Sequence, residues 1–238
     1  MTPIVSIKNL TVIKNRFTVL NDINIDIEYG DCIAVIGPNG AGKTTFLKTI
    51  NGLIDNCFGT VKVLGMPLDN KIKSKIGYIP QNNNFDSLMP VSVREVISIG
   101  LTAQFGIFRK FTNFDRKTVE DISKGLNIFN LIDKPIGQLS GGEIQKVSIA
   151  RVLVQNPQLI LMDEPLSNLD KKTQADILDL IDFIYHEQNI TMLIVVHNLS
   201  QIPKCCNKAI LISKGKIIDY GKKESVFANK QFREFYNL

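Results

Sequence analysis

The segment GPNGAGKT, residues 37–44, restricts the possible folds of this chain more than any other. It fits the pattern G-x-x-x-x-G-K-[ST] of a phosphate-binding loop. The apolar run CIAVI precedes it and the helix-forming run KTTFLKTI overlaps its end. An ordinary glycine-rich turn is the alternative, but the order strand, loop, helix is the context that a phosphate-binding loop requires. The segment therefore predicts a nucleotide site.

The chemistry of this loop follows from its residue types. Glycines let successive backbone N–H groups point inward at phosphate, and the N-terminus of the following helix adds about half a positive charge. We expect Lys43 to reach the outer phosphates of ATP and the Thr44 hydroxyl to bind Mg²⁺. The residues predicted to bind the nucleotide in this loop are Gly37, Pro38, Asn39, Gly40, Ala41, Gly42, Lys43, Thr44 and Thr45.

The distribution of apolar residues predicts an α/β fold. Residues 1–36 contain the alternating runs IVSIKNLTVI and LNDINIDI, which are typical of antiparallel strands with one wet face. CIAVIG, LILMDE and MLIVVH are continuously apolar, as in parallel strands that are covered on both faces. After about residue 208, KAILISKGKIIDYGK is typical of a closing hairpin.

The middle of the chain has helical spacing and no run typical of a buried strand. We therefore predict a P-loop NTPase (RecA-like) core with an antiparallel β flank, residues 1–86 and 157–238, and a helical insert, residues 87–156. Two Ser-x-x-Glu pairs, which begin at Ser92 and Ser140, predict capping boxes at the starts of helices in this insert.

Polar residues stand where several apolar runs end, which is where parallel α/β sheets bind ligands. Asp163 and Glu164 follow LILM, His197 follows MLIVV, and Gln81 comes just after IGYI. Asp163 suits the shell of a Mg²⁺ ion, and Glu164 is the candidate general base for an attacking water. His197 could hydrogen-bond the γ-phosphate of ATP, and Gln81 could contact the water or the metal.

Each of these residues also has a structural interpretation when it is taken alone. An Asp-Glu pair after a strand is often a helix cap, and a single histidine there is often structural. Their common placement, in a chain that also carries a phosphate-binding loop, favours hydrolysis of ATP.

A second glycine-rich segment, LSGGE at residues 139–143, is harder to explain. Ser140 and Glu143 predict a capped helix, but Gly141 and Gly142 in a first turn each cost roughly 0.5–1 kcal/mol relative to alanine. Glycine is favoured there if another group must approach the backbone closely, and a bare helix N-terminus binds anions. One nucleotide needs only one such loop, so the segment suggests a second anion-binding end.

The complete set of motifs resembles the ATP-binding subunits of ABC transporters over almost the whole chain. The phosphate loop (Walker A) is GPNGAGKTT, the Q-loop residue is Gln81, and the signature is LSGGE. Walker B is LILMDE, the D-loop is SNLD at 167–170, and the switch histidine is His197. These motifs occur in the family's order, and together they are highly specific.

The resemblance implies a head-to-tail homodimer in which the signature of one subunit covers the ATP held by the other. Ser140, Gly141 and Gly142 would then contact the partner's nucleotide, and Asp170 would link the two sites. The family usually places an aromatic residue near position 14 to stack on adenine. Lys14 stands there, so Phe17 is the candidate for this role. Other departures are Glu143 in place of glutamine, Lys146 in place of arginine, and Asn198 after the histidine.

The resemblance also implies partners and a place in the cell. We expect transmembrane permease subunits, an extracytoplasmic substrate-binding protein, and a peripheral position on the cytoplasmic face of the inner membrane. The insert is similar to those of bacterial manganese and zinc importers, with iron-chelate importers as the alternative. The loop around Phe85, Leu88 and Met89 is the expected docking segment, although these residues could instead fill the insert's own core.

Composition bears on the other classes of function. A net charge of +5 without long runs of one sign does not predict nucleic-acid binding, which an ABC-type ATPase acting on DNA or the ribosome would need. A kinase-type P-loop protein would leave LSGGE unexplained. The N-terminus lacks a leader pattern, and no apolar run is long enough to span a bilayer. The four cysteines show no metal-ligand spacing and are expected to be reduced thiols.

Overall fold

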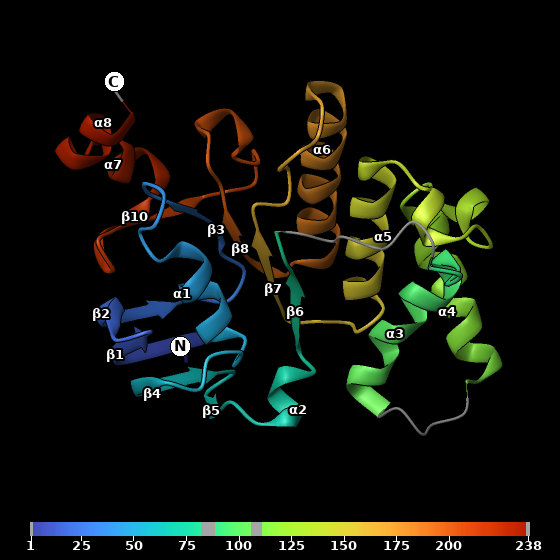
Figure 1. The fold of residues 1–238 in the computed structure, drawn as a ribbon, viewed down its shortest axis with the longest axis horizontal. Helices are drawn as coiled ribbons and strands as arrows, with labels where there is room; N and C mark the ends of the chain where they lie inside the picture. Colours follow the sequence, from blue (N-terminus) through green and yellow to red (C-terminus); the bar gives the residue numbers. More distant parts are fainter. Residues whose placement is uncertain (1, 82–88, 106–110, 237–238) are drawn as a thin grey trace.

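The computed structural model describes residues 2–81, 89–105 and 111–236, and it contains two β-sheets (Figure 1). The four-stranded sheet is antiparallel and has the order β2-β1-β4-β5. Its strands are β1 (Val5–Lys14), β2 (Phe17–Ile27), β4 (Cys57–Val63) and β5 (Met66–Pro67). The expectation of antiparallel strands in the first part of the chain is confirmed for β1 and β2, whereas β4 and β5 were not predicted from the sequence.

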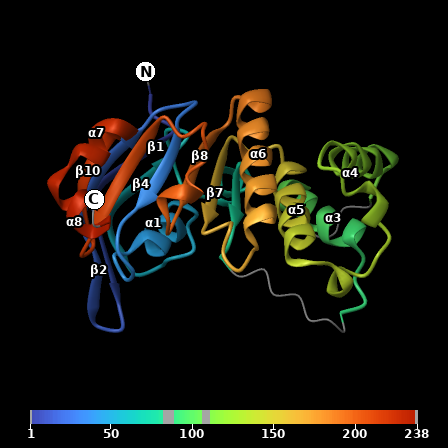
Figure 2. The same cartoon turned by 90° about the horizontal axis from the view of Figure 1, so that it is seen from above.

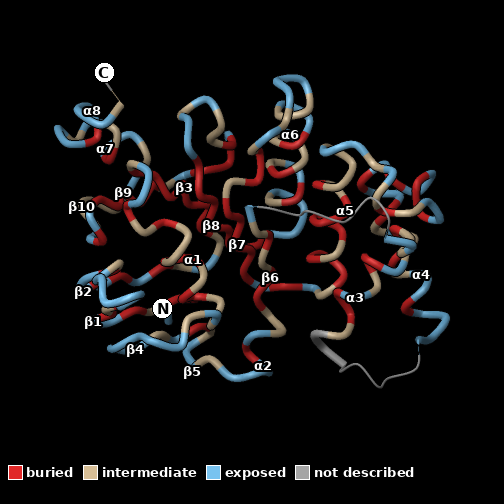
Figure 3. Tube along the Cα trace, viewed as in Figure 1, coloured by how far each residue is buried: buried red, intermediate tan, exposed pale blue. Residues whose placement is uncertain are grey.

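The six-stranded sheet has the order β10-β9-β3-β8-β7-β6, and only the pairing of β9 with β10 is antiparallel. Its strands are β3 (Cys32–Ile36), β6 (Ile76–Ile79), β7 (Leu159–Asp163), β8 (Thr191–Val195), β9 (Lys208–Ser213) and β10 (Lys216–Lys222). Every residue of β3, β7 and β8 is buried, which confirms parallel strands covered on both faces and the hairpin that follows them (Figure 3).

Each face of this central sheet packs into its own hydrophobic core. Ile33 and Val35 of β3 belong to the core formed with α1 (Lys43–Ile50) and the antiparallel sheet. Ala34 and Ile36 belong to the core shared with α6 (Lys171–Gln188) and the helices beyond it. This alternation follows from the two-residue period of a strand. Figure 2 shows α1 on one side of the sheet and α6, then α5, on the other.

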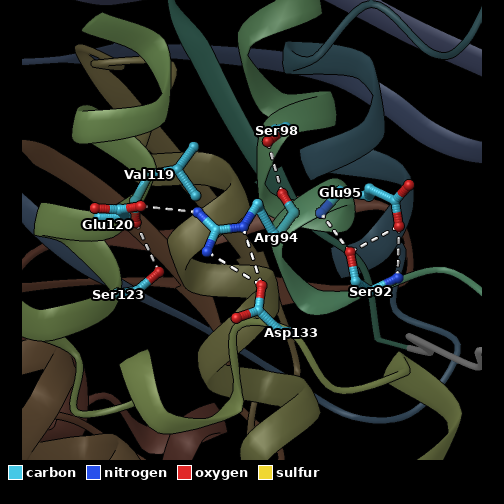
Figure 4. Close-up of polar contacts among 8 residues, drawn as sticks. All are labelled: Ser92, Arg94, Glu95, Ser98, Val119, Glu120, Ser123 and Asp133. Atoms are coloured by element: carbon cyan, nitrogen blue, oxygen red, sulfur yellow. Dashed lines mark hydrogen bonds and ion pairs between the residues drawn. The ribbon is translucent and has the colours of Figure 1, made fainter. Parts of the chain in front are cut away.

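The described helices between β6 and β7 form the helical part of the molecule. They are α3 (Val93–Phe105), α4 (Asn113–Gly125), η1 (Phe129–Leu131), η2 (Ile136–Gln138) and α5 (Gly141–Leu153). Arg94 of α3 ties this part together, because its guanidinium lies 3.0 Å from Glu120 and 3.1 Å from Asp133 (Figure 4). The predicted boundaries of the insert, 87–156, stay a prediction.

Both predicted capping boxes are present. The Ser92 N–H donates to Glu95 at 2.8 Å and the Glu95 N–H donates to the Ser92 hydroxyl at 3.3 Å (Figure 4). The same reciprocal pair joins Ser140 and Glu143 at the start of α5. Each pair satisfies two backbone N–H groups that a helix start would otherwise leave without a partner.

The remaining short elements were not anticipated from the sequence. They are α2 (Asn70–Lys73), η3 (Leu199–Gln201), α7 (Lys223–Ala228) and α8 (Lys230–Tyr236). The last two helices pack through stacked rings, with Phe227 and Phe232 at 4.7 Å between centroids. Within the described ranges, none of the helices combines the length and the apolar character needed to cross a bilayer.

Candidate functional site

The glycine-rich loop after β3 is held in a conformation that other residues would not adopt. Gly37 has a φ of 143°, and a Cβ there would overlap the Ile212 carbonyl of β9. Lys43 begins α1, and its ammonium donates to the carbonyls of Gly37 at 2.8 Å and Pro38 at 3.0 Å. The side chain thus spans the loop and closes it, which places a cation against the backbone that is predicted to bind phosphate.

Burial lowers the pKa of Lys43, and the nearby carboxylates of Glu164 and Asp163 oppose that effect. The lysine is 5% exposed, so its charge is screened little by solvent. A partly desolvated cation of this kind attracts a polyphosphate more strongly than an exposed lysine does.

A hydroxyl and a carboxylate meet beside the loop. The Thr44 hydroxyl of α1 donates to Asp163 Oδ1 at 2.9 Å, at the carboxyl end of β7. The Tyr78 hydroxyl lies 3.4 Å from the other oxygen of the same carboxylate. Burial raises the pKa of Asp163, while the hydrogen bond from Thr44 and the positive charge of nearby Lys48 oppose the rise. One carboxylate and one hydroxyl at the mouth of a phosphate loop fit Mg²⁺, which takes few carboxylates and keeps waters.

Glu164 is the centre of a second polar cluster. Its Oε2 accepts a hydrogen bond from Gln81 Nε2 at 2.6 Å, and its Oε1 lies 3.1 Å from His197 Nε2. The backbone of Glu164 has a φ of 50°, a left-handed conformation that is uncommon outside glycine. Strained backbone of this kind concentrates at functional sites. The two side-chain contacts bring Gln81 and His197 together at the carboxylate of Glu164.

A cavity of about 310 Å³ joins the loop to this cluster. The residues that line it are Val19, Asn39, Gly40, Ala41, Gly42, Lys43, Thr44, Thr45, Glu164 and His197. Most of the predicted phosphate-binding residues and three of the predicted catalytic residues, Lys43, Glu164 and His197, therefore face one space. Gly37, Pro38, Gln81 and Asp163 lie outside this lining, although Asp163 contacts Thr44 and Gln81 contacts Glu164.

Phe17, the candidate for adenine stacking, does not line this cavity. It begins β2 next to a turn and is 75% exposed. Val19 lines the cavity instead, because the ladder between β1 and β2 skips it: Ile13 pairs with Thr18, and Val12 pairs with Leu20. Such a β-bulge changes the direction of a side chain, so the two-residue alternation of a regular strand does not predict where it points. Stacking by Phe17 stays a prediction.

The residues of the LSGGE segment lie apart from this cavity. The Ser140 hydroxyl donates to Glu143 at 2.7 Å, and that bond together with the Ser140 N–H lowers the pKa of Glu143. Ser140 and Gly141 are exposed. None of Ser140, Gly141, Gly142 and Asp170 lines the cavity at the phosphate loop.

The two glycines of this segment have a reason within the chain that the sequence analysis missed. A Cβ on Gly142 would overlap the Thr173 methyl group, and one on Gly141 would lie 3.2 Å from Leu169. Thr173 is itself fixed, since its hydroxyl donates at 2.6 Å to Asp170, the N-cap of α6. Close packing of α5 against the start of α6 therefore requires a small residue at position 142 even without an external ligand.

Sequence reasoning also missed two tyrosines. Tyr78 contacts Asp163 from β6, and burial raises its pKa, so its phenol stays neutral. Tyr236 of α8 accepts a hydrogen bond from the Gly37 N–H at 3.3 Å, so the last described helix touches the first residue of the loop. Only the apolar run before Gln81 could have indicated Tyr78. No local pattern indicates a contact between residues 37 and 236.

Comparison with known proteins places these features in a family context. The family model described as ABC transporter matches residues 20–167. The manganese transport system ATP-binding protein of Halalkalibacterium halodurans is 33% identical over 236 residues, covering 99% of this chain and 93% of that protein. The zinc uptake system ATP-binding protein of Listeria innocua is 33% identical over 221 residues, covering 92% and 86%.

The chain is also similar to a protein named for a different cargo and to solved structures. A protein of Yersinia pestis named for a chelated iron transport system is 31% identical over 230 residues, covering 96% of this chain and 77% of that protein. A bacterial ABC transporter cassette solved as a dimer has a TM-score of 0.80 and 28% identity, covering 92% of this chain and 98% of that chain.

Proposed function

Since this chain belongs to the ABC transporter family, as an ATP-binding subunit that hydrolyses ATP, we propose that it powers the import of Zn²⁺ or Mn²⁺. Its curated relatives named for zinc and manganese match it over nearly their whole length. The observation that supports the catalytic part best is the shared cavity, in which the phosphate loop faces Glu164 and His197.

In the proposed mechanism, the loop N–H groups and Lys43 bind the phosphates of ATP. Glu164 takes a proton from the attacking water, because its carboxylate stands in the same cavity as the loop. His197 donates a hydrogen bond to the γ-phosphate, and its Nε2 is already directed to this region by Glu164. Thr44, Asp163 and Gln81 would hold Mg²⁺, which supplies charge neutralisation for the phosphates when it is bound.

The proposed active unit is a head-to-tail homodimer. Each chain presents a capped, exposed helix start at Ser140, separate from its own cavity at the phosphate loop. Ser140, Gly141 and Gly142 would contact the nucleotide of the partner subunit, with N–H groups of the first turn facing anionic phosphate. Asp170 would join the two sites, since its place beside the LSGGE segment is fixed by Thr173.

The dimer would work with transmembrane permease subunits and, outside the cell, with a substrate-binding protein. A peripheral position on the cytoplasmic face of the inner membrane follows from that assembly. The helical insert, with the predicted boundaries 87–156, is the proposed contact with the permease. The alternative cargo is chelated iron, which the name of the similar Yersinia pestis protein favours. Action on nucleic acid is a weaker alternative, because the charge balance is mild.

Inactivating the subunit in its native cell tests the cargo. Lys43→Ala removes the cation that closes the loop, and we expect cell zinc or manganese to fall selectively when the medium is limited in metals. Lys71→Ala, which changes an exposed lysine of α2 outside the helical insert, serves as the matched control. Elemental analysis of whole cells gives the readout. A fall in iron alone, or in no metal, would disprove the zinc and manganese assignment and leave the ATPase function intact.

The permease contact is tested on Met89, which precedes α3 and is 44% exposed. Phe85 and Leu88, the other predicted docking residues, lie outside the described residues. We expect Met89→Asp to retain soluble ATPase activity and to lose co-purification with the membrane subunits, because a charge replaces an apolar contact. Phe183→Asp, at an exposed position of α6, is the control. Unchanged co-purification of the Met89 variant would exclude this contact.

A further inference from the structure

Three of the four cysteines meet in the interior of the protein, although they are far apart in the sequence. Cys32 Sγ lies 3.2 Å from Cys205 Sγ and 3.4 Å from Cys206 Sγ. All three sulfurs lie within 4.8 Å of one another, and all three residues are buried. The spacing of the cysteines along the chain does not predict this arrangement in space. We call these residues the cysteine cluster.

The spacing of the sulfurs matches the size of a thiolate metal site. Three thiolates at about 2.3 Å from one ion stand about 3.8 to 4.0 Å apart in tetrahedral or trigonal geometry. The separations from Cys32 Sγ, 3.2 and 3.4 Å, are shorter than that range, so an ion could enter after these two pairs separate by roughly half an ångström. A disulfide would need two of the sulfurs to approach to about 2.0 Å and would leave the third as a thiol.

Three hydrogen bonds, two with Asn207 and one with Asp182, hold the backbone around the cluster. The Cys32 N–H donates to the side chain of Asn207 at 3.1 Å, and the Asn207 N–H donates to the Cys32 carbonyl at 3.0 Å. Asp182 of α6 accepts the Cys205 N–H at 2.8 Å. Because these bonds fix both chain segments, little rearrangement entropy opposes binding of an ion.

The thiols of the cluster are the ligand type that a soft cation prefers. Cysteine binds a metal ion as the thiolate, so an ion held by all three sulfurs would displace the three thiol protons.

We propose that Cys32, Cys205 and Cys206 bind one thiophilic d¹⁰ metal ion, Zn²⁺ or Cu⁺, at a site separate from the nucleotide. Soft thiolate ligands select these ions, whereas Mn²⁺ and Mg²⁺ prefer oxygen. Zn²⁺ leaves the smaller net charge in the interior, because three thiolates with Zn²⁺ carry −1 and with Cu⁺ carry −2. The site does not depend on the identity of the transported cargo.

The location of the cluster gives the ion a structural role. Cys32 begins β3, whose other end carries the phosphate loop. Cys205 and Cys206 end the connection that leads from His197 at the end of β8 to the start of β9. An ion would therefore fasten the base of the strand that bears the loop to the segment that follows the histidine.

Metal uptake by the purified full-length chain tests the proposal. The reduced protein is dialysed anaerobically against Zn²⁺, Cu⁺ or Mn²⁺ in separate experiments, desalted, and analysed for metal. We expect about one equivalent of Zn²⁺ or Cu⁺ per chain and none of Mn²⁺. Cys206→Ala should reduce retention at least about tenfold, while Cys57→Ser, at the exposed cysteine outside the cluster, should retain the metal. Comparison of the Zn²⁺ and Cu⁺ experiments decides between the two ions.

A second measurement uses the wild-type chain, so that poor folding of a variant cannot hide the result. Co²⁺ added as a probe for Zn²⁺ should give the near-ultraviolet sulfur-to-metal absorption of thiolate ligation. Equal metal retention by wild type and Cys206→Ala would overturn the proposal. So would a Co²⁺ spectrum without thiolate absorption, or a Cys32–Cys205 disulfide in the anaerobically purified chain with no metal bound.

Discussion

Replacing Glu164 with Gln is expected to lower steady-state ATP turnover by about 10²-fold or more, while ATP binding persists. The amide keeps the size of the side chain and leaves Lys43 and the loop unchanged, so the phosphates still bind. It cannot take a proton from water, which is the role that the place of Glu164 in the cavity suggests. Phosphate release and binding of a fluorescent ATP analogue measure the two effects separately.

Glu187→Gln, at an exposed position in the last turn of α6, is the control and should leave turnover unchanged. Near wild-type turnover in Glu164→Gln would remove the residue from the role of general base. Loss of ATP binding would instead indicate that the contacts of Glu164 with Gln81 and His197 maintain the shape of the cavity.

The second large expected effect is dimerisation that depends on the bound nucleotide. The Glu164→Gln protein is expected to elute as a dimer with Mg-ATP and as a monomer with ADP, because slow hydrolysis preserves the nucleotide that both subunits contact. Lys43→Ala alone and Ser140→Arg alone should each abolish ATP hydrolysis. Lys43→Ala damages the phosphate-binding loop, and Ser140→Arg blocks the helix start that would contact the nucleotide of the partner subunit.

An equal mixture of these two variants should recover about one quarter of wild-type activity, since half of the dimers are mixed and each of those has one intact site of two. The intact site combines the loop of the Ser140→Arg subunit with the LSGGE segment of the Lys43→Ala subunit. Activity no higher than that of the separate variants, or a monomer under every nucleotide condition, would count against the head-to-tail dimer.

Site residues that lie at the end of a single strand or at the start of a single helix could be predicted from the sequence. Lys43 and Thr44 lie in a local motif, and Glu164 and His197 follow buried strands, so the order of residue types was sufficient. The contacts among them agree with the predicted shared edge, because parallel strands bring their carboxyl ends together.

The rest depends on geometry that no local pattern contains. Val19 lines the cavity because of a bulge, and Gly142 is needed because Thr173 packs against it. The left-handed backbone of Glu164 has no signature in residue type. The cysteine cluster joins positions 173 and 174 residues apart, which spacing rules for metal ligands do not consider.

The central place of β3 in its sheet has a consequence for the order of events during synthesis. Its two neighbours are β8 and β9, and Ile33 pairs with Leu193 on one side and Lys208 on the other. On the ribosome, the strand that bears the phosphate loop therefore emerges early but has no sheet partner until most of the chain has followed it. Tyr236, which binds Gly37, emerges later still. We therefore expect a nascent chain to acquire its nucleotide site late, and its apolar early strand to need shielding until then.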